Sequence, residues 1–268
     1  MTISIRTPQT IAEFDWVEQL QAEIWGSRED AVPSHLLLTL AKESGIVHVM
    51  LDGETPIGFS FGFLSRTESG LLKLASHQAG VRAAYRGQGL GYQLKLAQRE
   101  AALALGLKLI TWTFDPLQSA NARLNLHKLG AVCRTYYRNL YGDMADLLNE
   151  GLPSDRFRVD WWLESGHVAA RLAGEDSPAE PVLPAVPRFS PPANPAAFLE
   201  SLAGPACLVE IPANLPQLKT DDPALARRWR LDTRQIFETL FTRGYTAIDL
   251  LHHGGQTFIL LQHNWQPL

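Results

Sequence analysis

A glycine-rich turn close to a histidine is the part of this sequence whose residue types could do chemistry. Residues 86–91 read Arg-Gly-Gln-Gly-Leu-Gly and follow an apolar run at 71–81. Three alternating glycines let the backbone turn tightly and approach a ligand closely. A helix that begins at Gly89 directs its free N–H groups and the positive end of its dipole into this turn. The sequence therefore predicts a phosphate or pyrophosphate site.

Two familiar nucleotide motifs do not fit this spacing. A Walker loop ends in Gly-Lys-Ser/Thr, whereas Gly91 is followed by Tyr92 and Gln93, which argues against a nucleoside triphosphatase. The dinucleotide fingerprint G-x-G-x-x-G needs its third glycine one residue later, although Asp115 lies at about the expected distance downstream. A Rossmann-type dinucleotide-binding protein is therefore disfavoured.

The spacing that does fit is Arg/Gln-x-x-Gly-x-Gly, supplied by Arg86, Gly89 and Gly91 after the lead-in Val81 and Tyr85. It resembles the acyl-CoA-binding motif of the GNAT superfamily of N-acyltransferases. The resemblance covers roughly residues 1–164 and implies acetyl-CoA, or another acyl-CoA such as succinyl-CoA, as co-substrate. It also implies that the turn holds the CoA pyrophosphate and that the end of the preceding strand pairs with the pantetheine arm. The cofactor-binding residues carried over are Ala79, Gly80, Val81, Arg86, Gly87, Gln88, Gly89, Leu90, Gly91, Ser119 and Asn121.

His77 is the candidate base for acyl transfer to an amine. It lies four residues before Val81, an even offset that places both side chains on one face of a strand. The offset looks like that of a catalytic histidine in the arylalkylamine branch of the family, and imidazole titrates near neutral pH. The alternative is a non-catalytic histidine whose hydrogen bonds are satisfied by a neighbouring strand or by solvent. The resemblance further implies that a main-chain amide of residues 79–81 stabilises the oxyanion.

The group that protonates the departing CoA thiolate is left open by the sequence. In the family, a tyrosine of the helix Asn-x-x-Ala-x-x-x-Tyr-x-x-x-Gly-Phe often does so. When this chain is registered on Gly130, Ser119 stands at the usual asparagine and Leu126 at the usual tyrosine. Tyr141, Tyr137 or water are the remaining donors, and Tyr141 is the one we predict to be catalytic.

The elements that must position these residues follow from the spacing of apolar residues and from glycine and proline. Helices are expected at 11–25, 36–42, 90–105, 119–130, 166–173 and 222–243. Strands are expected at 2–6, 45–50, 56–65, 71–81, 107–114, 132–141, 157–163, 206–211, 245–251 and 257–262. The predicted fold class is α/β (α+β), a GNAT-like central mixed, mostly antiparallel sheet flanked by helices, plus a small C-terminal β-α-β-β module.

Proline content suggests where the chain divides. Seven of the 17 prolines lie between Pro178 and Pro195, too closely spaced for a helix or a central strand. We therefore expect an acyl-CoA-binding domain at 1–164, a helix and Pro-rich linker at 165–195, and the β-α-β-β module at 196–268. Because that module is small to stand alone, it is expected to pack on the first domain.

Composition limits the partners. The formal net charge of −4 gives no basic footprint, so neither nucleic acid nor an anionic membrane surface is expected as a partner. The sequence has no apolar run of membrane-spanning length and no signal-peptide core, so we expect a cytoplasmic protein. Cys133 and Cys207 lack metal-like spacing, and no metal site is predicted.

Taken together, these features predict an enzyme: an acyl-CoA-dependent N-acyltransferase. It would move an acetyl or larger acyl group to a primary amine of a small molecule or amino acid by direct attack. The alternative hypothesis, kept open by Leu126, is a catalytically silent acyl-CoA-binding protein that docks a partner. A homodimer stays open, and the sequence identifies neither the acceptor amine nor the acyl group.

Overall fold

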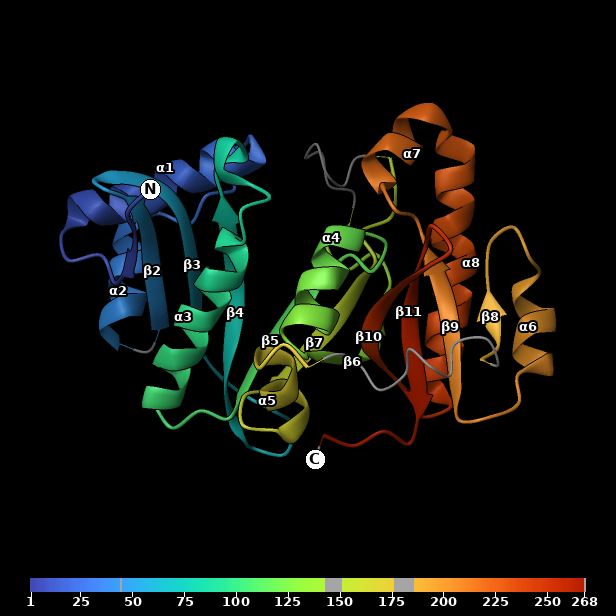
Figure 1. The fold of residues 1–268 in the computed structure, drawn as a ribbon. Helices are drawn as coiled ribbons and strands as arrows, with labels where there is room; N and C mark the ends of the chain where they lie inside the picture. Colours follow the sequence, from blue (N-terminus) through green and yellow to red (C-terminus); the bar gives the residue numbers. More distant parts are fainter. Residues whose placement is uncertain (44, 143–150, 176–185, 268) are drawn as a thin grey trace. The chain divides into compact units, whose positions relative to one another are not determined.

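The computed structural model describes the whole chain except residues 44, 143–150, 176–185 and 268 (Figure 1). It divides into two compact units, Met1–Trp112 and Thr113–Leu268. The domain boundaries expected at residues 164 and 195 stay a prediction, and some of the expected Pro-rich linker lies outside the described residues.

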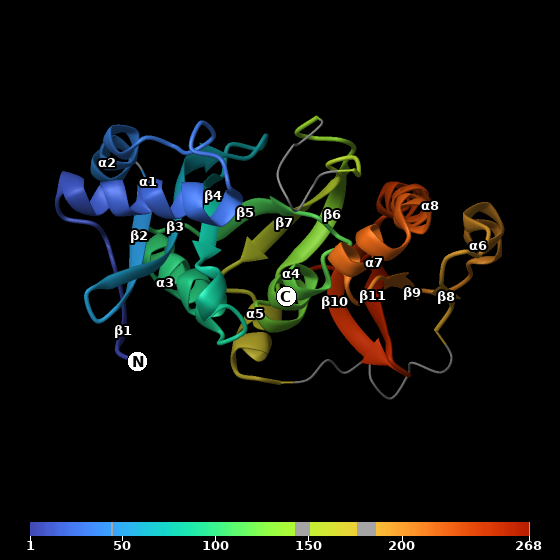
Figure 2. The same ribbon diagram turned by 90° about the horizontal axis from the view of Figure 1, so that it is seen from above.

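In the first unit, a mixed sheet lies between helices on both of its faces. Each pair of neighbouring strands is antiparallel, except that the last two strands pair in parallel. Helices α1 (Ile11–Trp25) and α2 (Ser34–Glu43) cover one face, and α3 (Leu90–Ala104) covers the other, as Figure 2 shows from above. The strand order is β1 (Ile3–Arg6), β2 (Gly45–Asp52), β3 (Thr55–Arg66), β4 (Leu72–Val81) and β5 (Leu109–Phe114), the last two residues of β5 belonging to the second unit.

Alternation along the strands gives each face of this sheet its own core. On the face covered by α1 and α2, the cluster comprises Phe14, Val17, Leu20, Leu37, Val47, Val49, Leu51, Phe59 and Phe61. On the opposite face, Met50 and Ile57 pack against Leu90 and Leu94 of α3, with Val81 at the edge of the cluster. A side chain on β3 or β4 can therefore be assigned to a face by the cluster that it contacts.

The second unit also contains a mostly antiparallel sheet, in which β8 and β9 form the parallel pair. Its strand order is β7 (Arg156–Trp162), β6 (Val132–Tyr137), β10 (Tyr245–His253), β11 (Gln256–His263), β9 (Ala206–Ile211) and β8 (Arg188–Phe189). Its helices are α4 (Ser119–Ala122), α5 (Gly166–Leu172), α6 (Pro195–Ser201), α7 (Leu215–Asp221) and α8 (Pro223–Thr242). The predicted fold class, a mixed, mostly antiparallel sheet flanked by helices, is confirmed. The predicted C-terminal strand-helix-strand-strand order is present with one additional short helix, α7, between β9 and α8.

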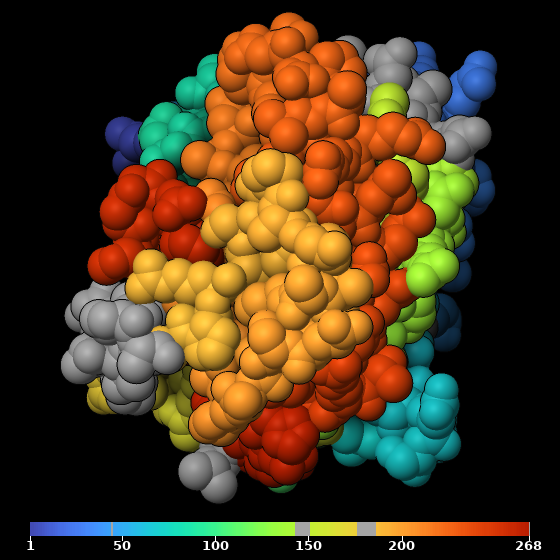
Figure 3. Space-filling view, turned by 90° about the vertical axis from the view of Figure 1, so that its right-hand side faces the viewer, coloured from blue at the N-terminus to red at the C-terminus, as the bar shows by residue number. Residues whose placement is uncertain are grey.

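The long helix α8 packs on the sheet of the second unit. Asp222 caps its first turn, with a carboxylate oxygen 2.9 Å from the Leu225 backbone nitrogen. Thr233 is fully buried whereas Leu231 is 41% exposed, so Thr233 and not Leu231 packs in the core. Figure 3 shows the face of this unit on which α6 and α8 lie side by side.

Some elements differ from expectation. The helix predicted over 119–130 is α4 followed by a π-helical turn at Arg123–Lys128, in which the Leu129 N–H reaches the Leu124 carbonyl five residues back. Such wide turns insert one residue into a helix, so the face that each side chain presents changes along the segment. Helices α6 and α7 and the short strand β8 were not predicted. Within the described ranges, no helix is both long and apolar enough to cross a bilayer.

Candidate functional site

The glycine turn at the end of β4 has the backbone that its sequence predicts. Gly87 and Gly89 have φ angles of +79° and +77°, in the left-handed region that favours glycine. Gly89 is the N-terminal cap of α3. In the portion of the chain that the structure describes, no backbone N–H of residues 87–91 has a hydrogen-bond acceptor. These N–H groups and the positive end of the helix dipole are suited to binding an anion.

Two arginines flank this turn. The predicted ligand Arg86 is exposed, and its Nε donates to the Val81 carbonyl at 3.2 Å, which ties it to the end of β4. Arg82, which the sequence did not single out, donates from Nε to the Glu23 carboxylate of α1 at 2.9 Å. The α1 helix is therefore linked to the start of the turn by an ion pair.

A β-bulge interrupts β4 at His77. Phe61 of β3 pairs with Gln78, but the next β3 residue, Gly62, pairs with Ser76, so His77 is the extra residue. A Cβ added at Gly62 would lie 2.6 Å from the Ala75 carbonyl oxygen, closer than packing permits. Glycine at this position therefore allows the backbones to approach at the bulge.

The bulge decides which face His77 occupies. The ring centroid of His77 lies 5.4 Å from that of Phe61 and 6.2 Å from that of Phe63, on the face covered by α1 and α2. Val81 instead packs in the cluster beneath α3. The prediction that His77 and Val81 share a face is therefore wrong, because the extra residue breaks the alternation of β4. His77 is solvent-exposed at one side, and its partial burial lowers the pKa of the imidazole, which favours the neutral base.

Strands β4 and β5 separate just before the bulge. Their parallel pairing consists of Leu74 with Ile110 and Ala75 with Thr111, and β4 then continues to Val81. The predicted ligands Ala79, Gly80 and Val81 lie on this continuation, whose pairing within the described residues is to β3. We call the place where the two strands separate the fork.

The side chain of Lys95 reaches the fork from α3. Its Nζ donates to Ser76 Oγ at 2.9 Å and to Gln98 Oε1 at 3.2 Å, and it lies 3.9 Å from the centroid of the Trp112 ring. Lys95 is only 6% exposed, and burial lowers the pKa of its amine to about 7. The sequence did not single out this residue. Its one signal in the sequence is its position on the helix, next to Leu94 and three residues before Gln98, on the side that is buried.

The remaining predicted residues belong to the second unit. Tyr141 is 52% exposed, its hydroxyl lies 2.8 Å from Thr113 Oγ1, and the Arg156 guanidinium lies over its ring. Ser119 begins α4 and Asn121 is exposed on it. Because His77 lies in the first unit, the structure does not test whether these side chains approach it, and their roles stay predictions.

The two cysteines are free and buried. Burial raises the pKa of Cys207 to about 12 and that of Cys133 well above its ordinary value, which disfavours the nucleophilic thiolate. The described residues contain no cluster of three His, Cys, Asp or Glu side chains able to hold a metal ion.

Comparisons with known proteins gave matches among solved structures. No family model matches this chain, and no curated protein matches it. Naa50 from Arabidopsis thaliana, in complex with the bisubstrate analogue CoA-Ac-MVNAL, is 15% identical over 60% of this chain and 98% of its own, with a TM-score of 0.48. The ribosomal-protein-S18-alanine N-acetyltransferase from Escherichia coli is 14% identical over 59% and 92%, with a TM-score of 0.45. A putative acetyltransferase of the GNAT family from Desulfovibrio desulfuricans is 13% identical over 60% and 99%, with a TM-score of 0.47.

Proposed function

We propose that this protein is an acyl-CoA-dependent N-acyltransferase that acylates a primary amine of a small molecule or amino acid. The observation that carries the proposal is the turn at 87–91, whose N–H groups have no acceptor in the described chain. Backbone donors at a helix N-terminus suit a pyrophosphate, and the turn follows a strand that separates from its neighbour.

The chemistry can be assigned to the residues of the first unit. Residues 87–91 bind the pyrophosphate, with Arg86 adding a cation. The β4 segment beyond the fork pairs with the extended acyl-pantetheine arm, and an amide of residues 79–81 stabilises the oxyanion. His77 accepts a proton from the attacking amine. The N–C bond forms while the thioester carbonyl becomes an oxyanion; the carbonyl then re-forms as the C–S bond breaks, and CoA leaves as a thiolate.

A second function, acyl-CoA binding without turnover, is favoured by one observation. Leu126 is fully buried and occupies the position of the family's usual tyrosine, so that position supplies no proton donor. Catalysis consequently depends on a donor elsewhere. Release of free thiol from bound acyl-CoA over a panel of amines distinguishes the two functions, because only the transferase releases thiol when an amine is present.

The test of the binding site is Gly89→Val. A β-branched residue at a φ of +77° strains the turn by about 1–3 kcal/mol, so we expect acyl-CoA affinity to fall about tenfold or more. Isothermal titration with acetyl-CoA, succinyl-CoA and NADH measures this and identifies the ligand class.

Gly106→Val is the matched control for that variant. Gly106 has a φ of +73° and open space around it, as Gly89 has, but it lies at the other end of α3. The control should carry similar strain and keep its affinity. Unchanged acyl-CoA affinity in folded Gly89→Val, or binding of NADH in place of a CoA ester, would overturn the proposal.

A further inference from the structure

The amine of Lys95 occupies the fork itself. The last paired residues are Ala75 and Thr111, so Ser76 and Trp112 are the first residues of β4 and β5 beyond the pairing. Lys95 contacts both of them, through Ser76 Oγ and over the Trp112 ring. A buried lysine is therefore placed where the strands begin to separate, the segment along which the acyl-pantetheine arm is proposed to bind.

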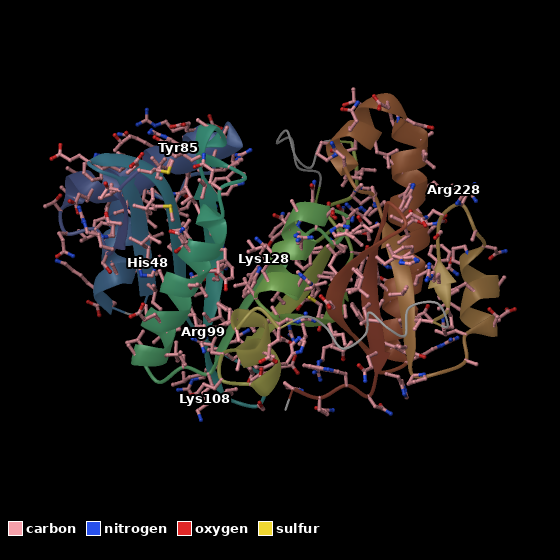
Figure 4. The ribbon with its side chains drawn as sticks, in the orientation of Figure 1. His48, Tyr85, Arg99, Lys108, Lys128 and Arg228 are labelled. Atoms are coloured by element: carbon pink, nitrogen blue, oxygen red, sulfur yellow. The ribbon has the colours of Figure 1, made fainter. Side chains whose placement is uncertain are left out.

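Among the described residues, no carboxylate contacts Lys95, so nothing there balances its charge. Its contacts are the Ser76 hydroxyl, the Gln98 amide and an indole ring. Beneath the same helix, His48 of β2 lies close to Ser60, and burial lowers its pKa to about 4, so it carries no charge near neutral pH. Figure 4 labels His48 and Arg99, the next cation along α3. A lysine in this setting loses its proton far more readily than one in water.

The two faces of β4 at the fork carry different groups. His77 lies against Phe61 and Phe63 on the face of α1 and α2, whereas the adjacent Ser76 points to Lys95 on the face of α3. A base on one face and an acid on the other match a reaction in which the amine arrives from one side and the thiolate departs toward the other.

Unpartnered polar atoms also lie near the fork. Within the described residues, Gln98 Nε2 and Gln78 Oε1 are buried without a hydrogen-bond partner. Buried polar atoms of this kind cost free energy unless something satisfies them. Gln78 pairs with Phe61 and so lies on the face of α1 and α2, whereas Gln98 belongs to α3. An extended ligand that carries an amide carbonyl on the side of α3 would offer Gln98 Nε2 the acceptor that it lacks, as the pantetheine arm does.

We propose that Ser76, backed by Lys95, is the acid that protonates the departing CoA thiolate. The inference rests on the proposed function. Ser76 Oγ–H gives its hydrogen to the sulfur as the C–S bond breaks, and the Lys95 ammonium gives one of its hydrogens to Ser76 Oγ. The products are CoA thiol, an unchanged serine and a neutral lysine amine, which regains a proton from solvent. Ser76 is then the residue in contact with substrate, and Lys95 acts through it.

The direct test is the pKa of the thiol of bound CoA. An ammonium behind Ser76 stabilises the thiolate, so the thiol pKa that is calculated from the thiolate fraction below about pH 7, where Lys95 carries its proton, should be lower on the wild-type protein than on Lys95→Met. Titration of protein-bound CoA, followed by the ultraviolet absorbance of the thiolate, measures this without an acceptor amine. We expect a difference of about one pKa unit or more. Ser76→Ala, which removes the relay, tests the same contact.

The control variant is Lys42→Met, at an exposed lysine near the end of α2, which should leave the thiol pKa at its wild-type value. Methionine has nearly the volume of lysine, so Lys95→Met is expected to fold. Equal thiol pKa values on wild type and Lys95→Met, with CoA bound to both, would overturn the inference and leave the proposed function standing. Failure of the wild-type protein to bind CoA would overturn both.

A kinetic readout separates proton supply from structural support. With an accepted amine, kcat of the wild type should fall as pH rises and Lys95 loses its proton. Lys95→Met should have a kcat lower by about 10²-fold, with KM for acyl-CoA little changed, and should lack that fall. If kcat of Lys95→Met fell at the same pH, the fall would belong to the titration of another group, and the inference would be contradicted.

Discussion

Helices α3 and α8 each bury a cation on the face that packs against a sheet, but the cation of α8 has a charged partner and that of α3 has uncharged ones. Arg230 of α8 is 1% exposed, and its Nη2 lies 2.5 Å from the Asp115 carboxylate. Burial opposes the charge of this guanidinium, yet Asp115 holds its pKa above the ordinary value. Lys95 of α3 has a hydroxyl and an amide as hydrogen-bond partners, and burial lowers its pKa to about 7.

The difference separates a structural cation from a reactive one. A guanidinium opposite a carboxylate keeps its charge at every physiological pH, so it can stabilise a fold but cannot exchange protons. An amine without a carboxylate changes charge near neutral pH and so can take part in proton transfer. Burial alone therefore does not mark a functional lysine or arginine, and the chemistry of the partner decides.

The largest effect is expected from Asp115→Asn. This change leaves the Arg230 guanidinium buried without its counter-charge, at a cost of about 3–5 kcal/mol in unfolding free energy. Equilibrium denaturation by urea measures the loss. Asp232→Asn, which removes the partner of the exposed Arg228, is the matched control and should cost less than about 1 kcal/mol. Equal losses of unfolding free energy in the two variants would show that the buried Arg230–Asp115 pair contributes no more to stability than an exposed pair.

Lys95→Met should have the opposite effect on stability. An unfolded lysine holds its proton up to a pKa of about 10.4, whereas Lys95 in the folded chain loses its proton near pH 7. Between these values the unfolded state binds the extra proton, so wild-type stability rises with pH by about 1.4 kcal/mol per unit. Lys95→Met lacks this contribution.

We therefore expect Lys95→Met to be more stable than wild type at neutral pH, with a gap that narrows toward about pH 10. Urea denaturation of both proteins across that range measures the gap. A loss of stability that does not vary with pH would show that Lys95 serves the fold in the way that Arg230 does.

The smallest effect is expected from Glu23→Gln. The ion pair of Glu23 with Arg82 is largely exposed, so its loss should change the unfolding free energy by less than about 1 kcal/mol. Because Arg82 lies at the start of the glycine turn, the same variant should weaken acyl-CoA binding slightly, by about twofold. Titration with acetyl-CoA at low and high salt measures this, and a tenfold loss of affinity would place Arg82 among the ligands.

Helix ends and the glycine turn could be predicted from the sequence because local chemistry determines them. Helix α1 begins and ends where predicted, since Thr10 accepts a hydrogen bond from the Glu13 N–H and Gly26 terminates the helix at a φ of +80°. The turn at 87–91 has glycines where the backbone needs a positive φ. These features depend on residues within a few positions of one another, so they can be predicted without knowing which parts of the chain pack against them.

The bulge and the buried lysine could not be predicted because they depend on neighbouring strands. Strict alternation predicted that His77 and Val81 share a face, and it fails because Gly62 on β3 allows an extra residue on β4. In the helix predicted over 90–105, Leu105 is exposed and Lys95 is buried, the reverse of what their side-chain polarity favours. A lysine beside a hydrophobic stripe ordinarily extends its amine to water, and the partner that retains it, Ser76, lies 19 residues away.

The bulge in β4 also has a consequence for how this chain could tolerate insertions and deletions. Gly62 pairs with Ser76 and Phe61 with Gln78, so the strand alternates regularly on either side of His77. Removal of His77 would therefore give a regular strand without turning over either half of β4, and Leu74 and Ser76 would keep their faces. A one-residue insertion elsewhere in β4 would instead have to form a second bulge or make Leu74, now fully buried, exchange faces with Lys73. Loops such as the one around Gly53 can change length without reversing any strand.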